Sequence, residues 1–131
     1  MASFCVTLFD TIENPIDNDA CFVTATKNLT LNKGSSYKII YSLYKDGSGV
    51  DLTGYSLRGV IKPSSTSSDI MLNLSTANLL LEINNSNSTI AMNLKESFTR
   101  RVTVASAVYD IEILNNVGDA TKIITGLITF V

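Results

Sequence analysis

Two carboxylates near the end of the chain have the chemistry needed for acid–base catalysis. Asp110 and Glu112 stand two positions apart in a run of alternating polar and apolar residues. In a strand this spacing places both side chains on one face, and glycoside hydrolases use such a pair to cleave a sugar bond. Alternating charges on a solvent-facing strand produce the same pattern and are far commoner. We therefore expect surface charges here and no catalytic residues.

Metal and nucleophile chemistry has little support in the sequence. The chain contains no histidine, the commonest general base and metal ligand. Cys5 and Cys21 do not make a zinc site without histidine, and in a cytosolic protein they are more often reduced than paired. Asp46 and Asp51 flank a glycine-containing turn, but calcium needs more oxygen ligands than this turn offers. We expect no metal, no cofactor and no enzyme activity.

The segments that would have to position any site follow the period of β-strands. Apolar residues alternate with polar ones in several short runs, as in strands with one buried face. Polar turns separate the runs roughly every ten residues, the spacing of a sandwich or barrel. A last run, 121–131, is apolar on both faces, which indicates a central strand or one covered by a partner. The alternating runs are 37–44, 55–63, 70–74, 79–84, 89–94 and 108–115.

One segment has the period of a helix instead. Leu94, Phe98 and Val102 stand four apart, which predicts a single helical turn across the end of the sandwich. Tyr109 follows this turn. In immunoglobulin sandwiches a tyrosine early in the penultimate strand hydrogen-bonds back across the preceding corner. Tyr109 is therefore a candidate tyrosine corner, with an ordinary half-buried strand tyrosine as the alternative.

The first 27 residues differ from the rest. Two strand-like runs flank an acidic segment that contains Pro15. We divide the chain into an N-terminal arm or edge-strand segment, 1–27, and a sandwich, 28–131. The apolar side chains of the first segment need cover, either from the sandwich itself or from a neighbouring subunit. They form a candidate assembly interface, made of Phe4, Val6, Leu8, Phe9, Phe22 and Val23.

The composition of the chain excludes some classes of binding partner. A chain of 131 residues fits one domain. Its 17% charged residues suggest a surface partly covered by partners, although a Ser/Thr/Asn-rich sandwich accounts for that value nearly as well. The net charge is −2 and basic residues are scattered, which argues against nucleic-acid binding. No apolar run is long enough to span a bilayer and the first residues do not match a secretion signal, so we expect no membrane partner and synthesis in a cytoplasm.

A resemblance adds to this description. The stretch LTLNKGSSYKIIYSLYKDGSGVDLTGYSLRGVIKP, residues 29–63, resembles a recurring pattern in virion proteins of tailed bacteriophages. The pattern runs from a strand through a glycine turn and a second strand to DG..VDLTG and a strand with a basic residue. Its later half has a YD.E strand, here residues 109–112, and a closing strand with a glycine, here Gly126. The resemblance covers about residues 29–131 and depends on the order and spacing of short pieces, while the N-terminal arm has no counterpart.

The resemblance implies an all-β fold, an antiparallel immunoglobulin-like β-sandwich of about seven to nine strands. With the predicted helical turn, this is the expected fold class. The family implies assembly and not catalysis, and it brings no catalytic residues. It also accounts for DGSGVDLTG as a structural turn, in which Asp51 caps the turn, Leu52 enters the core and Gly54 takes a positive φ.

The leading functional hypothesis is a non-enzymatic structural subunit of a tailed bacteriophage particle, in the tail, baseplate, neck or fibre attachment. Its partners would be other virion proteins, with multiple copies in a symmetric assembly, and it would be made and assembled in the cytoplasm of the bacterial host. The alternatives are a carbohydrate-binding host-recognition module and a head-decoration protein. A host glycan is a partner that the sequence permits but does not indicate.

Overall fold

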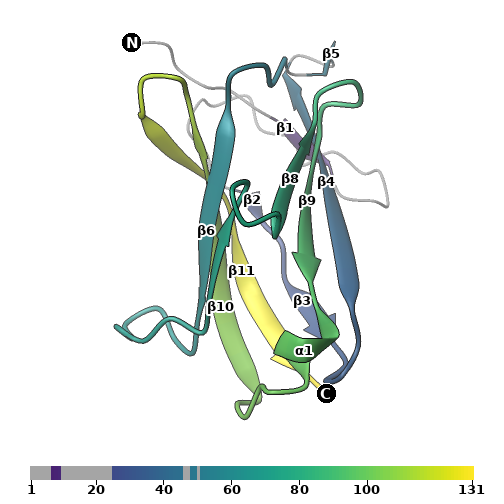
Figure 1. Cartoon of the computed structure of the whole chain (residues 1–131), viewed down its shortest axis with the longest axis vertical. Coiled ribbons are helices and arrows are strands. Elements are labelled where there is room, and N and C mark those ends of the chain that lie inside the picture. The colour runs from purple at the N-terminus through teal and green to yellow at the C-terminus, as the bar shows by residue number, and fades with distance from the viewer. Residues whose placement is uncertain (1–6, 10–24, 46–47, 50) are drawn as a thin grey trace.

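The chain folds into two β-sheets packed face to face (Figure 1). The computed structural model describes residues 7–9, 25–45, 48–49 and 51–131. The first sheet has the order β1-β4-β9-β8, with β5 paired to β4. Its strands are β1 (Thr7–Phe9), β4 (Tyr37–Lys45), β5 (Ser48–Gly49), β8 (Leu81–Asn84) and β9 (Thr89–Leu94).

The second sheet has the order β2-β11-β10-β6-β7, with β3 paired to β11. All pairs in both sheets are antiparallel except those of β2 and β3 with β11. Within the described residues the one helix is α1 (Glu96–Thr99), which carries the chain from the first sheet to the second. The strands of this sheet are β2 (Ala25–Thr26), β3 (Leu29–Leu31), β6 (Ser56–Lys62), β7 (Leu72–Ser75), β10 (Ser106–Leu114) and β11 (Ala120–Phe130).

This arrangement is an all-β sandwich with one helical turn, as the sequence predicts. Its strand order also resembles that of an immunoglobulin sandwich: the first sheet contains the path β1-β4-β9-β8, and in the second sheet the last two strands, β10 and β11, follow β6. The described residues contain eleven strands and not seven to nine. The difference arises because four of them, β1, β2, β3 and β5, are only two or three residues long and lie on sheet edges or near turns.

The core lies between the sheets and is built by the predicted alternation. β10 shows it most clearly, since every second residue from Ala107 to Ile113 is buried and those between are half-buried. Burying a large apolar side chain stabilises the fold by roughly 1.5–3 kcal/mol, so these contacts hold the two sheets together. The other large core side chains include Tyr41, Leu43, Leu57, Ile61, Leu74, Leu81, Ile90, Met92, Leu94, Ile124 and Ile128.

A β-bulge explains much of the two-sided apolar character of the last strand. Ile124 pairs with Ile111 and Lys122 pairs with Glu112, so Ile123 is an extra residue in β11. Both neighbouring isoleucines are consequently buried. β11 is also a central strand, because β10 lies on one side of it and β2 and β3 on the other. Of its outward residues, Leu127 is the large apolar one, and it is 44% exposed.

Candidate functional site

Residues 51–54 of the stretch DGSGVDLTG form the corner that leads into β6. Oδ1 of Asp51 accepts hydrogen bonds from the backbone N–H of Thr53 at 3.0 Å and from its hydroxyl at 2.7 Å. The side chain of Leu52 is part of the core, with 2% of its surface exposed. Gly54 has a φ of 83°, which residues with a Cβ rarely adopt. All three residues therefore serve the turn itself, and Asp46 lies outside the described residues.

Asn85, from the turn between β8 and β9, ties this corner to the first sheet. Its Oδ1 accepts the backbone N–H of Leu52 at 2.6 Å, and its Nδ2 donates to Oγ1 of Thr53 at 2.8 Å. Nδ2 also lies 3.3 Å from Oδ1 of Asp51. Hydrogen bonds from the Thr53 hydroxyl, the Thr53 backbone and Asn85, in that order, lower the pKa of Asp51. The polar groups of the corner are thus engaged with one another.

Tyr109 does not make the hydrogen bond that the tyrosine-corner hypothesis predicts. Its hydroxyl donates to the backbone carbonyl of Lys27 at 2.7 Å, and so bonds to the segment between β2 and β3. Because its proton is used there, Tyr109 accepts the hydrogen bond from the Tyr41 hydroxyl, at 2.8 Å. The hypothesis is wrong because Tyr109 points into the sandwich from the middle of the sheet, where the Lys27 carbonyl approaches. Gly126 permits that approach, since a Cβ at this position would clash with the Lys27 oxygen.

The two tyrosines form a buried link between the sheets. Tyr41 comes from β4 and Tyr109 from β10, and both are at most 1% exposed. Burial raises the pKa of Tyr41 far above its ordinary range, with the neighbouring Tyr109 adding to the effect. Burial also raises the pKa of Tyr109 to about 12, against a smaller opposite effect of its bond with Tyr41. Both hydroxyls therefore stay protonated at physiological pH and act as structural hydrogen-bonding groups.

The candidate assembly residues lie mostly outside the described part of the chain. Phe4, Val6, Phe22 and Val23 belong to residues 1–6 and 10–24, which the structure does not describe. Leu8 and Phe9 belong to β1, whose backbone pairs with β4 opposite Leu43 and Ser42. At the other end of the same segment, β2 pairs with β11. The described pieces of the N-terminal region are therefore edge strands of both sheets.

The two carboxylates with catalytic spacing are held in ion pairs. Oε1 of Glu112 lies 2.8 Å from Nε of Arg58, and Oδ2 of Asp110 lies 3.7 Å from Nζ of Lys122. Their neighbours in the sheet are thus basic side chains and not a cavity between two acids. Among the residues that the structure describes, no three histidine, cysteine, aspartate or glutamate side chains gather where they could hold a metal ion.

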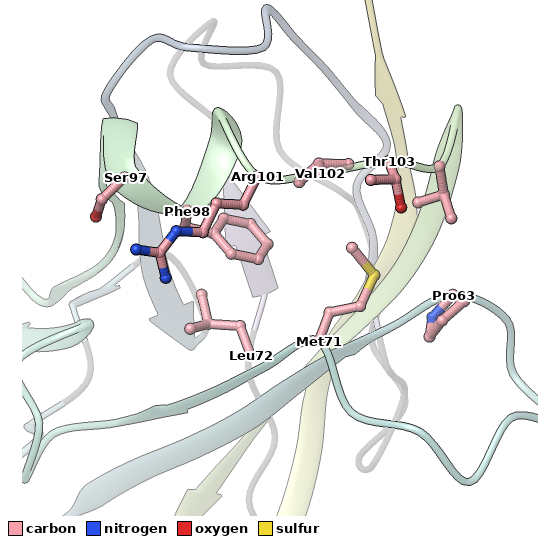
Figure 2. A pocket seen from close by; sticks show the side chains of 9 residues that line it. Pro63, Met71, Leu72, Ser97, Phe98, Arg101, Val102 and Thr103 are labelled. Carbon is pink, nitrogen blue, oxygen red and sulfur yellow. The ribbon is translucent and has the colours of Figure 1, made fainter.

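A groove at the opposite end of the sandwich from the corner is a candidate binding site among the described residues. It has a volume of about 490 Å³, within the range of ligand pockets. Figure 2 shows Phe98 and Arg101 on one side and Met71 and Leu72 on the other; Phe98 and Met71 point toward each other, and the Arg101 side chain runs across Phe98. Its lining is mostly apolar and consists of Pro63, Met71, Leu72, Ser97, Phe98, Arg101, Val102, Thr103 and Val104.

Hydrogen bonds between Thr99 and the turn before β4 hold α1 in place beside the groove. Thr99 is fully buried. Its hydroxyl donates to the carbonyl of Ser35 at 2.7 Å and accepts the N–H of Gly34 at 3.1 Å, so the helix is joined to the turn between β3 and β4. Fixing Thr99 positions its neighbours Phe98 and Arg101 at the groove. The sequence pattern predicted the helical turn, and the structure adds that Phe98 is half-buried and lines the groove.

Arg101 is the cation of this groove. Its side chain is exposed and makes no ion pair with a described residue. The neighbouring Arg100 differs, since it pairs with Glu96 one helical turn before it. A guanidinium beside apolar side chains can bind a carboxylate in a bidentate way while its stem contacts apolar groups. The groove therefore suits a ligand that is apolar and acidic.

Comparison with known proteins assigns no family. The sequence matches no protein-family model, and a search of curated proteins finds no significant match. In the part of the chain that the structure describes, no helix is both long and apolar enough to cross a membrane.

Proposed function

We propose that this chain is a non-enzymatic structural subunit of a tailed bacteriophage particle, located in the tail, baseplate, neck or fibre attachment. The observation that supports it most is the construction of the DGSGVDLTG corner. The residues that carry the resemblance to virion proteins, Asp51, Leu52 and Gly54, are used to turn the chain and close the core. These three residues are used by the fold, so the motif itself gives no sign of a substrate site.

The surface supports a role in assembly. Several large apolar side chains are exposed, with 48% for Ile70, 71% for Leu79 and 44% for Leu127. The apolar groove beside α1 adds to them. Protein interfaces have apolar centres with arginine enriched among their polar residues, and this is the composition of the groove. In this proposal other virion proteins cover these surfaces, in multiple copies with symmetry, after synthesis in the bacterial cytoplasm.

The state of the carboxylates supports a role without catalysis. A general acid or base needs a carboxylate that is free to exchange protons with a substrate. Asp110, Glu112, Glu82 and Glu96 each have a basic side chain as partner. Such pairs are typical of charged surface strands and helices, where an ion pair contributes little to stability.

Quantitative mass spectrometry of purified virions tests the proposal directly. We expect the particle to contain this chain at the copy number of a tail, neck or baseplate ring, in a constant ratio to a known ring protein. A number equal to that of the major capsid protein would instead identify a head-decoration protein. Absence from particles, with the chain found only in the lysate, would refute a structural role.

A polar hollow on the outer face of the first sheet favours a second candidate, glycan binding. It has a volume of about 420 Å³, and Lys38, Glu82, Asn84, Asn85 and Asn87 contribute to its lining. Amide and carboxylate groups suit sugar hydroxyls, but the lining has no aromatic ring for a sugar to stack on. A screen against glycans of the host surface tests this candidate. Binding that Asn87→Ala removes without unfolding would favour it over assembly alone.

A further inference from the structure

The groove beside α1 combines two features that together specify its occupant. Its walls are apolar, and its one cationic lining residue, Arg101, makes no ion pair with a described residue. By contrast, Lys38, Arg58 and Arg100 are each paired with a carboxylate. A segment that buries aliphatic side chains and offers a carboxylate would satisfy both features.

The chain itself contains a segment with this chemistry. Residues 10–19, DTIENPIDND, which we call the acidic segment, contain four carboxylates and no basic residue. Ile12 and Ile16 stand among the carboxylates. The acidic segment therefore offers aliphatic side chains for the apolar walls of the groove and a carboxylate for Arg101.

The strands on either side of this segment, β1 and β2, lie away from the groove of the same molecule. β1 ends at Phe9, opposite Ser42, and β2 begins at Ala25, opposite Ile124. The groove lies near the other end of β11, where the N–H of Phe130 bonds to the carbonyl of Ala105, and on the β7 edge of the sheet. Figure 1 shows β1 and β2 in the half of the sandwich away from α1.

Chain length limits how far a segment between β1 and β2 can reach. From Ile124 to Phe130 the distance along the strand is about 20 Å, and from β2 to β7 the distance across the sheet is about 19 Å. A path between these points must also pass around the packed sandwich. The 15 residues from 10 to 24, held at both ends, reach at most about 25 Å from their attachment points. The acidic segment can therefore reach a neighbouring molecule's groove more easily than its own.

We propose that the acidic segment of one copy docks in the Arg101 groove of a second copy. Ile12 or Ile16 enters the apolar space between Phe98 and Met71, and an adjacent carboxylate pairs with Arg101. This inference rests on the proposed function, because it takes as the partner another copy of the chain in a multi-copy assembly. It adds the two surfaces that meet and the charges that align them.

Mixing two variants of the full-length chain tests the docking. The first, Arg101→Glu, keeps the acidic segment and disables the groove. The second carries Asp10→Asn, Glu13→Gln, Asp17→Asn and Asp19→Asn, which keeps the groove and neutralises the segment. Lys95→Glu is the matched control, because Lys95 is exposed next to α1 and does not line the groove. Sedimentation velocity measures the oligomeric state, and circular dichroism checks the fold of each variant.

We expect the wild type and Lys95→Glu to self-associate equally, and each of the two other variants to associate at least about tenfold more weakly. An equimolar mixture of those two should restore association, because one intact segment then meets one intact groove. A monomeric wild type at about 100 µM, a concentration at which contacts of this size are populated, would overturn the inference. So would a mixture that stays monomeric, or an Arg101→Glu variant that associates as the wild type does. Self-association is measured without virions, so its failure leaves the proposed function to be judged by virion composition.

Discussion

The chain crosses between the two sheets at both ends of the sandwich, but the two ends differ in how their polar and apolar groups find contacts. At the corner end, Asp51, Thr53 and Asn85 bond to one another and Leu52 fills the core beneath them. At the groove end, Phe98, Met71 and Arg101 face an open space. Both ends must turn the chain between the sheets, but only the corner satisfies its apolar and polar groups within one molecule.

This contrast indicates which end is available to a partner. A network whose hydrogen bonds are already made gains little from a partner and loses bonds if it is disturbed. An apolar groove with an unpaired cation gains from being covered, because both the apolar area and the charge find contacts. Substitutions at the corner should therefore affect folding, and substitutions at the groove should affect association.

Leu52→Ala should have the largest effect on folding. It removes a side chain that is 2% exposed and leaves a cavity under the corner, at a cost of about 2–5 kcal/mol. Urea unfolding followed by circular dichroism measures this loss. Leu72→Ala, in the half-buried wall of the groove, is the matched comparison and should cost less. Equal losses at the two positions would contradict the contrast between the ends.

Gly54→Ala should destabilise the fold by about 1–2 kcal/mol, because a Cβ is disfavoured at a φ of 83°. No neighbouring atom lies within 4 Å of the position that the Cβ would occupy, so the cost is conformational and not steric crowding. Gly54→Asn should lose less stability than Gly54→Ala, since asparagine tolerates positive φ. Thermal or urea unfolding of the two variants gives the comparison, and an alanine variant as stable as the wild type would show that the corner can relax.

The corner should also make stability depend on pH in acid. The hydrogen bonds to Asp51 lower its pKa in the folded state, so its contribution is fully present above the ordinary pKa of about 3.9 and is lost as pH falls through the lowered value. Urea midpoints measured between about pH 2 and pH 5 should therefore fall less steeply for Asp51→Asn than for the wild type. Asp69→Asn, an exposed carboxylate outside the corner, serves as the control. Parallel curves for Asp51→Asn and the wild type would show that the network does not favour the charged form.

Arg101→Ala should have the smallest effect on the isolated fold. The side chain is exposed and makes no ion pair with a described residue, so the change in unfolding free energy should stay within about 0.5 kcal/mol. Urea unfolding at low protein concentration, where the chain is monomeric, measures this change in unfolding free energy without a contribution from association. A loss as large as that of Gly54→Ala would mean that Arg101 supports the fold and that the groove is part of the core.

Local pattern predicted the strands and their buried faces well. In β4, β6, β9 and β10 the residues predicted to face inward are buried or half-buried, because alternation along a strand is set by the backbone alone. Two apolar residues were misplaced. Ile70 is exposed because β7 begins only at Leu72, and Leu79 is exposed because it lies in a turn with a φ of 67°. Hydrogen bonds of the Asn78 side chain stabilise that turn. The spacing of apolar residues in the sequence gives no information about these bonds.

The sequence by itself determined the all-β class, the helical turn and the DGSGVDLTG corner, because each depends on residues close together in the chain. The tertiary structure decided which distant groups meet. Tyr109 bonds to Lys27 and Tyr41 across 82 and 68 positions, and Asn85 reaches Leu52 across 33. The groove likewise joins the segment before β7 to the residues after α1. Such contacts depend on the order in which strands pair, and periodicity within a strand carries no information about that order.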